Sequence, residues 1–389
     1  MSVVLYGTRI FTPTSVEADT VVVSDDGIVT YIGPMETAPW VDGLRIDLRG
    51  RIVAPGFIDL HTHGGHGVTF GMMETLAEDL EDYSAWAPST GVTGFLCTVA
   101  APDGGSLVSL VSEYVELFET GAWPGARPLG LHLEGPFLNV EKKGAFNPEW
   151  LREPAIGQAR SVLEAGHGWI RQMTLAPELP GAEEVAAVLR GKGVAAAMGH
   201  TNADYDGASR ALRANFTHVT HTFNAQKGFH HREPGVFGAI MASDHVTAEL
   251  IADSIHVHPG AMKMLLRCLG MDRVVLITDA MAGAGLPDGE YELVGQKVTV
   301  REGKATLADG TIAGSAATMD ACVRNLHREV GVTLLDAVRM ASLNPARAMG
   351  LAGTWGSLQV GKRANLVVID EDVSISLAMV DGTVIHQDF

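Results

Sequence analysis

The sequence is poor in cysteine, in basic residues and in aromatic residues, and the first two shortages exclude whole classes of protein. Its three cysteines, Cys97, Cys268 and Cys322, are far apart and odd in number. They therefore predict neither a disulfide framework nor a Cys-x-x-Cys metal motif, and we expect each to be a small buried residue. Lys and Arg total 28 against 46 Asp and Glu, a net charge of −18. Such a chain should not bind nucleic acid or an anionic membrane non-specifically.

Long apolar stretches are also missing. No run of 18 or more apolar residues occurs, so no membrane-spanning helix is predicted. Residues 1–11 lack the basic segment, apolar core and cleavage site of a secretory signal. We therefore expect a cytoplasmic protein, and an anionic ligand would need cations placed close to it.

Hydrophobic residues make up 46% of the 389 positions, enough to form a large core. Both ends of the chain have the pattern of short strands separated by turns, such as Asp25-Asp26-Gly27 and Asp381-Gly382. The expected strands are Val3–Leu5, Thr20–Ser24, Ile28–Ile32, Arg45–Asp47, Ala364–Ile369, Ile375–Val380 and Thr383–His386. We predict that residues 1–52 and 353–389 pair into one small β-sandwich domain.

The middle of the chain, residues 53–352, alternates apolar runs with helical patterns such as Gly181–Leu189 and Pro259–Leu269. The eight runs are Ile52–Leu60, Thr93–Val99, Pro128–Leu133, Trp169–Leu175, Val194–Met198, His218–His221, Ala248–Ala252 and Val274–Thr278. Eight strand–helix units over about 300 residues predict an α/β fold, a TIM-like (β/α)8 barrel with a parallel sheet. This barrel is expected to be the metal-dependent catalytic domain.

Metal-binding residue types stand at the ends of five of these runs. They are His61, His63, Glu134, His200, His221 and Asp279. His61 and His63 are two apart, so they share one face of a strand. An isolated His-x-His is a weak signal, but residues at the carboxyl ends of barrel strands line the active-site mouth. We predict one or two divalent ions there. We expect Zn²⁺, although nitrogen and oxygen ligands also suit Fe²⁺, Mn²⁺ and Co²⁺.

Longer motifs surround the same positions. They are Pro55–Gly64 (PGFIDLHTHG), His132–Phe137 (HLEGPF), Gly199–Thr201, His221–Ala225 (HTFNA), Arg232–Gly235, His256-Val257, Thr278–Ala280, Ala313–Ser315 and Gly361–Val368. Through these stretches the chain resembles the N-acetylglucosamine-6-phosphate deacetylase family of the amidohydrolase superfamily, over nearly its whole length. The HLEGPF and HTFNA stretches are specific, whereas His-x-His and the C-terminal stretch are shared across the superfamily.

The resemblance implies a role for each of these residues. Glu134, His200 and His221 match the ligands of the family's main metal, and Asp279 matches its general base and acid. His61 and His63 are expected to hold a second ion that shares Glu134 or a bridging water. The implied reaction is metal-dependent hydrolysis of the N-acetyl group of N-acetyl-D-glucosamine 6-phosphate, which gives D-glucosamine 6-phosphate and acetate.

The resemblance also implies a sugar pocket and a partner subunit. The residues expected to line the pocket are Ala145, Asn224, Ala225, Arg232, Asp253, Ser254, Ile255, His256, Ile312, Ala313 and Gly314. Arg232 is expected to reach the phosphate of the neighbouring active site, which implies a homodimer. The chain departs from the family at Phe146, where some members carry a His that polarises the amide carbonyl. It departs again at Ser254, where Gly is usual, and at Ala317, where Leu is usual.

Three alternatives stay open. One is a deacetylase for the galactosamine epimer. Another is a cyclic-amide hydrolase, but that class usually carries a carboxylated Lys on the fourth barrel strand, and Trp169–Leu175 contains none. The third is a non-catalytic scaffold, which the retention of all six strand-end residues disfavours. A metal assay combined with a turnover assay separates an enzyme from a scaffold.

Overall fold

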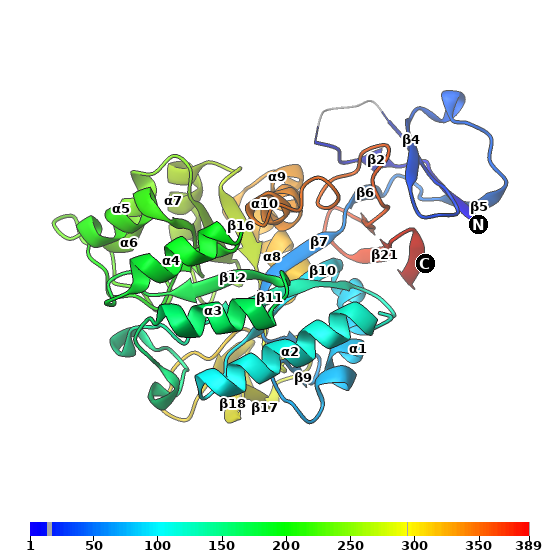
Figure 1. The fold of residues 1–389 in the computed structure, drawn as a ribbon. Coiled ribbons are helices and arrows are strands. Elements are labelled where there is room, and N and C mark those ends of the chain that lie inside the picture. Colours follow the sequence, from blue (N-terminus) through cyan, green and yellow to red (C-terminus); the bar gives the residue numbers. More distant parts are fainter. Residues whose placement is uncertain (14–17, 294, 389) are drawn as a thin grey trace.

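The computed structural model describes residues 1–13, 18–293 and 295–388, and in it a large barrel carries a small all-β domain on one side (Figure 1). Both chain ends lie in the small domain. The barrel strands are β7 (Phe57–Thr62), β10 (Val92–Val99), β11 (Arg127–Glu134), β12 (Ile170–Leu175), β13 (Ala195–Met198), β14 (Phe216–Val219), β15 (Thr247–Ile251) and β16 (Val274–Ile277). The predicted TIM-like barrel is confirmed.

Helices surround this sheet. They are α1 (Leu76–Trp86), α2 (Gly104–Thr120), α3 (Ile156–Ala165), α4 (Ala182–Gly191), α5 (Tyr205–Ala214), α6 (Gly235–Met241), α7 (Pro259–Leu269), α8 (Met319–Asn325), α9 (Leu334–Ala341) and α10 (Leu343–Ala348). The strands are buried on both faces: in β16, Val274 and Leu276 belong to the main apolar core, whereas Val275 and Ile277 belong to a second cluster. None of the described helices has the length and apolar character needed to cross a membrane.

The eight strands run parallel in chain order from β7 to β16. The first and last strands meet just beyond the end of β16. There the backbone N–H of Asp279 donates to the carbonyl of His61 at 2.8 Å, and the N–H of His63 donates to Ala280 O at 2.8 Å. Closure of the barrel therefore places the His-x-His segment beside Asp279.

The small domain is a sandwich of two sheets. One has the order β4-β3-β1-β5 and the other β2-β6-β20-β21-β22. The strands are β1 (Ser2–Tyr6), β2 (Arg9–Ile10), β3 (Thr20–Val23), β4 (Val29–Gly33), β5 (Gly43–Asp47), β6 (Ile52–Pro55), β20 (Leu366–Ile369), β21 (Ile375–Val380) and β22 (Thr383–Gln387). An apolar cluster that includes Leu5, Val21, Val368 and Leu377 fills the space between them. Strand β20 pairs with β6, so segments from both ends of the chain lie in one sheet.

The first barrel run differs from its prediction. Ile52–Leu60 is not one strand, because β6 pairs with β20 of the sandwich and the barrel begins at Phe57. Gly56 lies at this crossing. A side chain there would collide with Thr93, since a Cβ would lie 2.2 Å from its Oγ1. Residues 53–55, which we assigned to the barrel from the sequence, therefore pair with the small domain.

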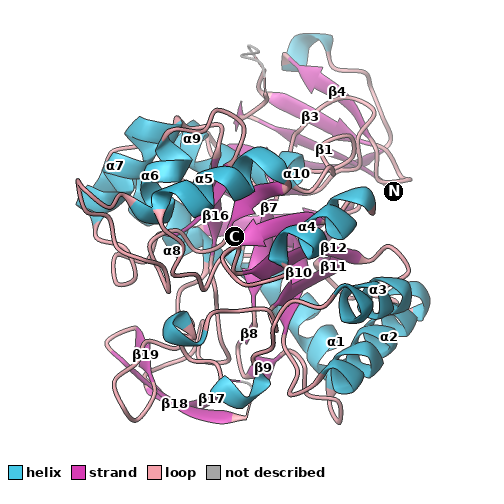
Figure 2. Cartoon of the chain, turned by 60° about the vertical axis from the view of Figure 1, so that its left-hand side comes forward, coloured by secondary structure: helices cyan, strands magenta, loops and turns pink. Residues whose placement is uncertain are grey.

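Two further features differ from the sequence-based expectations. Cys268 is exposed, whereas Cys97 and Cys322 are buried as expected. A three-stranded sheet of β17 (Gly289–Leu293), β18 (Gln296–Arg301) and β19 (Lys304–Thr306) follows the last barrel strand. Figure 2 shows this sheet at the end of the molecule opposite the small domain. Nothing in our reading of the sequence anticipated it.

Candidate metal centre and substrate pocket

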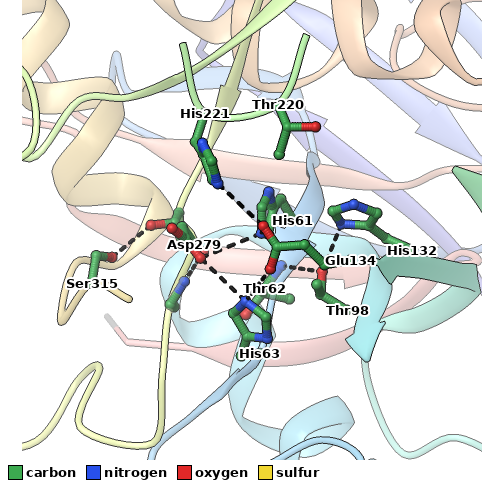
Figure 3. A network of polar contacts seen from close by, with 12 residues as sticks. His61, Thr62, His63, Thr98, His132, Glu134, Thr220, His221, Asp279 and Ser315 are labelled. Atoms are coloured by element: carbon green, nitrogen blue, oxygen red, sulfur yellow. Dashed lines mark hydrogen bonds and ion pairs between the residues drawn. The ribbon is translucent and has the colours of Figure 1, made fainter. Parts of the chain in front are cut away.

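Six titratable side chains meet where the barrel strands end. His61 belongs to β7 and His63 follows its last residue, and Glu134 is the last residue of β11. His200, His221 and Asp279 each stand two residues beyond a strand, namely β13, β14 and β16. All six residues are buried. Figure 3 shows Glu134 and Asp279 converging with His61, His63 and His221.

The backbone at three of these positions is unusual. His200, His221 and Asp279 have φ angles of 46°, 25° and 51°, the left-handed region that non-glycine residues seldom occupy. Strained backbone of this kind gathers at functional sites, where the surrounding structure holds it in place. The conformation turns the chain out of its strand at the point where the polar side chain is needed.

Glu134, His200 and His221 form one group of potential ligands. The Nε2 atoms of His200 and His221 are 3.0 Å apart, and each lies 3.1 Å from Glu134 Oε1. His200 Nδ1 lies 2.7 Å from the carbonyl oxygen of Lys142. If Nδ1–H donates to that carbonyl, a neutral His200 presents the lone pair of Nε2 to the group. Two imidazole nitrogens and a carboxylate oxygen that face one another fit a shared divalent cation.

His61, His63 and Asp279 form a second group beside the first. His63 Nε2 lies 3.1 Å from Glu134 Oε2 and 3.4 Å from Asp279 Oδ1. His61 Nε2 is 3.4 Å from the same Asp279 oxygen and 3.5 Å from Glu134 Oε1, yet it has no hydrogen-bond partner among the described residues. A buried nitrogen without a partner, aimed at two carboxylates, also fits a cation ligand.

A cavity of about 330 Å³ opens over both groups. Six of the residues expected to contact the sugar line it, and they are Ala145, Asn224, Ala225, His256, Ile312 and Gly314. Of the six strand-end residues, His63, Glu134, His200, His221 and Asp279 line it, whereas His61 lies beneath with no exposed surface. The cavity is large enough to hold a small ligand against both groups of side chains.

The profile of the amidohydrolase family matches residues 52–385, most of the chain. The chain belongs to this family. An N-acetylglucosamine-6-phosphate deacetylase from Bacillus subtilis is 38% identical over 86% of this chain and 84% of its own length. An N-acetylgalactosamine-6-phosphate deacetylase from Escherichia coli O157:H7 is 35% identical over 92% of both chains.

A solved structure has nearly the same fold as this amidohydrolase. It is an Asp-to-Ala mutant of N-acetyl-D-glucosamine-6-phosphate deacetylase from Mycobacterium smegmatis in complex with N-acetyl-D-glucosamine-6-phosphate. It has a TM-score of 0.89 and 35% sequence identity, and the match covers 99% of each chain. The family and the two groups of His, Asp and Glu residues are together consistent with a divalent metal in this protein.

The electrostatics of the amidohydrolase site favour charged groups although the side chains are buried. Burial would raise the pKa of Asp279, but the charge of His61 and the hydrogen bond with His63 lower it below the usual value. Burial likewise opposes protonation of His63, yet its hydrogen bonds with Asp279 and Glu134 raise its pKa to about 9. Burial also opposes protonation of His61, but the negative charges of Glu134, Asp279 and Glu249 raise its pKa well above the usual range. The histidines and carboxylates of the site therefore favour one another's charged forms.

Five predicted substrate contacts lie outside the cavity lining. Asp253 holds His256, since its Oδ2 lies 2.6 Å from His256 Nδ1. Ala313 is buried in an apolar cluster with β18, and Ile255 is partly exposed. Ser254 has a φ of 63° and donates its hydroxyl to Glu329 at 2.6 Å. The positive φ explains why glycine is usual at that position.

Arg232 is the fifth of these residues, and it lies on an exposed loop. Residues 228–233 are all exposed, including the aromatic side chain of Phe229. The guanidinium of Arg232 contacts His231 at 3.0 Å and forms no ion pair with any residue that the structure describes. Arg232 does not line the cavity of its own barrel.

Sequence reasoning missed several residues of the site. Trp150, Leu293 and Gln296 line the cavity, and Gln296 Nε2 donates to Ala145 O at 2.7 Å. No motif marks these three residues, because Trp150 comes from a short 3-10 helix and the other two from the unexpected sheet. Glu249, which contacts His61, was also missed. Its signal was present, since an acidic residue within the apolar run Ala248–Ala252 is buried only when it is paired.

Proposed function

We propose that this amidohydrolase hydrolyses the N-acetyl group of N-acetyl-D-glucosamine 6-phosphate to D-glucosamine 6-phosphate and acetate. The observation that carries the proposal is the position of two groups of metal-ligand residues under one cavity lined by Asn224, Ala225 and His256. The relatives from Bacillus subtilis and Mycobacterium smegmatis support the choice of reaction and substrate.

We further propose that Glu134, His200 and His221 hold one divalent ion, and that His61, His63 and Asp279 hold a second. Zn²⁺ is the expected metal, because imidazole and carboxylate ligands in this number suit it. When bound, such an ion supplies Lewis acidity, which brings the pKa of water to about 7 and polarises a carbonyl group.

Asp279 is the proposed proton carrier. Its lowered pKa keeps the carboxylate ionised at neutral pH, so it can accept a proton from the attacking water. As the C–N bond breaks, Asp279 returns that proton to the sugar nitrogen, which leaves as an amine. One carboxylate thus acts first as general base and then as general acid.

The oxygen that becomes negative during the attack also needs a donor. Phe146 cannot supply one, and its ring packs edge-to-face against His200 at 5.2 Å. We propose that His256 donates to the substrate instead. Asp253 holds its Nδ1, and although burial opposes protonation, the hydrogen bond and the charge of Asp253 raise the pKa of His256. The imidazolium form has an N–H on Nε2 available for donation.

Phosphate recognition is proposed to require two copies of the chain. With a net charge of −18, long-range attraction cannot bring a phosphate dianion to the site, so short-range contacts must bind it. Arg232 can grip a phosphate with two charge-assisted hydrogen bonds. Its exposed position outside its own cavity suits a role in the active site of a partner subunit. We propose a cytoplasmic homodimer on this basis, with the location resting on the sequence-based expectation alone.

The galactosamine epimer is the second candidate substrate, favoured by the relative from Escherichia coli O157:H7. The test is to incubate the purified, zinc-loaded protein with each N-acetylhexosamine 6-phosphate and to measure acetate and free amine. We expect rapid release of acetate from the glucosamine compound, slower release from its epimer, and loss of activity on chelation. If neither sugar phosphate is turned over by fully loaded protein, the proposed function is wrong.

A further inference from the structure

Glu249 is a charged side chain inside the barrel that no role has yet been given. It lies on β15 and has no exposed surface. Oε1 accepts a hydrogen bond from Gln172 Nε2 at 2.8 Å and contacts His218 Nε2 at 3.1 Å. Oε2 contacts His61 Nδ1 at 3.0 Å and accepts the backbone N–H of His221 at 2.9 Å. Four contacts satisfy a carboxylate whose burial would otherwise be costly.

The two oxygens of Glu249 face different surroundings. Oε1 faces Gln172 and His218, and neither of these residues belongs to the two ligand groups. Oε2 faces one histidine from each group, through the ring of His61 and the backbone of His221. If Glu249 had only a structural role, the contacts of both oxygens would matter equally. If it acts on the metal centre, the contacts of Oε2 with His61 and His221 are the ones that matter.

The contact with His61 decides which ring nitrogen can bind a metal. When Nδ1–H donates to a carboxylate, the neutral ring must present its lone pair at Nε2. Nε2 of His61 is buried and aimed at Glu134 and Asp279, and it has no hydrogen-bond partner among the described residues. The carboxylate also makes the imidazole a stronger donor to a cation.

We propose that Glu249 is a positioning residue for the metal centre, which orients His61 and makes the second ion site possible. This inference rests on the proposed function, because it assumes that His61 binds a metal. Strand β15 contributes no predicted ligand, but through Glu249 it fixes the orientation of His61, the ligand that β7 supplies. Glu249 itself does not touch the substrate or the ion.

The test compares Glu249→Gln with the control Gln172→Ala. The first keeps the shape of the side chain and removes its charge, whereas the second removes a contact to Oε1 and leaves the Oε2 side intact. Binding of Co²⁺ is measured by equilibrium dialysis with elemental analysis, and the visible spectrum of bound Co²⁺ reports on the ligand geometry. His61→Ala and the double variant His61→Ala/Glu249→Gln complete a cycle.

We expect wild-type protein to bind two ions per chain. In Glu249→Gln the affinity for the second should fall about 10- to 100-fold, the usual effect of removing a carboxylate behind a metal-binding histidine. Gln172→Ala should bind both ions with wild-type affinity and an unchanged spectrum. The double variant should bind no more weakly than His61→Ala, because Glu249 acts on the metal through His61.

Three results would overturn the inference. They are unchanged binding of both ions by Glu249→Gln, an equal loss in Gln172→Ala, and additive losses in the double variant. A wild-type chain that binds a single ion unaffected by His61→Ala would overturn it as well. Wild-type protein that binds no ion at all would instead reject the proposed metal centre. Thermal unfolding of the metal-free variants checks folding. If Glu249→Gln does not fold, Glu249→Asp takes its place in the comparison with Gln172→Ala. The shorter side chain keeps the negative charge but moves the carboxylate oxygens away from His61.

Discussion

The two ligand groups at the barrel mouth hold their histidines in parallel ways but assemble differently. In each group one histidine has its Nδ1 held: His200 by the backbone carbonyl of Lys142, and His61 by the side chain of Glu249. In each, the other histidine, His221 or His63, has an Nδ1 without a partner among the described residues.

The two groups that hold these Nδ1 atoms, the Lys142 carbonyl and the Glu249 carboxylate, differ in charge and in origin. A backbone carbonyl is neutral and cannot be removed by substitution, whereas Glu249 carries a negative charge and comes from a strand far along the sequence. The first group takes its ligands from β11 and from the turns after β13 and β14, whereas two of the three ligands in the second come from one strand and its end. Barrel geometry brings the ligands of both groups together, but only in the second group does a buried charged side chain, Glu249, hold one of the histidines.

The largest effect is expected from His200→Ala. Losing this ligand leaves Glu134 and His221 alone, so tight binding of the main ion and turnover should both fall to background. His61→Ala should lose only the second ion and keep part of the activity. Elemental analysis and acetate release measure the two outcomes, and circular dichroism checks the fold. Full metal content in His200→Ala would show that the groups have been wrongly assigned.

Asp279→Asn should have the next largest effect. The amide cannot carry a proton between water and amine, so turnover should fall by about 10²–10⁴-fold for each proton-transfer role lost. Substrate affinity should change little in protein that carries the main ion, because Asp279 is proposed to act in the reaction step and to hold only the second ion. Single-turnover kinetics and a binding titration separate these quantities. Turnover within a fewfold of wild type would exclude Asp279 as the proton carrier.

Arg232→Ala tests whether a residue of one chain binds the phosphate in the active site of its neighbour. Loss of charge-assisted bonds worth roughly 1.5–3 kcal/mol should raise KM for the phosphorylated sugar about 10- to 100-fold. KM for the unphosphorylated sugar should be unchanged. Dimers mixed from Arg232→Ala and Asp279→Asn chains should regain activity, because one site then combines an intact Asp279 with the partner's intact Arg232. Verified mixed dimers without any regained activity would place Arg232 in its own barrel or away from the phosphate.

The second group should bind its metal more weakly on acidification. With a pKa of about 9, His63 is protonated in the metal-free protein at neutral pH. A cation must therefore displace a proton. Raising the pH towards 9 should strengthen binding by up to about tenfold per pH unit for each proton displaced, and lowering it should weaken binding. Calorimetry in buffers of different ionisation enthalpy measures the released protons. Binding of the second ion that does not change between pH 6.5 and 8.5 would contradict the raised pKa.

The smallest effect is expected from Ser254→Gly, outside both groups. Glycine removes a left-handed strain of about 1–2 kcal/mol, but the hydrogen bond to Glu329, worth about 1 kcal/mol, is lost with it. The free energy of unfolding should therefore change by only about 1 kcal/mol, and KM should be unchanged because the hydroxyl contacts Glu329 and not the cavity. Chemical denaturation and steady-state kinetics provide the test. A KM raised several-fold would make Ser254 a substrate contact after all.

Local pattern was enough to predict most of the elements. The runs that became β10, β11 and β21 are largely apolar and bounded by polar or turn residues, so their burial could be predicted directly from the sequence. The sheet of β17–β19 was missed because its strands are only half buried, which leaves no continuous apolar run. The break at Gly56 was missed because both of its flanking strands are fully buried, and hydrophobicity is therefore continuous across two domains.

Local sequence pattern was enough to predict which residues could bind a metal and that His61 and His63 share a strand face, because the alternation of side chains along a strand is local. It could not determine which ring nitrogen of His61 is free, nor that Asp279 lies beside it. Those facts depend on closure of the barrel, which joins residues more than 200 positions apart, and on Glu249, 188 residues from His61 in the chain. Only the tertiary structure decides these contacts, because a buried carboxylate orients a histidine only when the fold brings the two within hydrogen-bond distance.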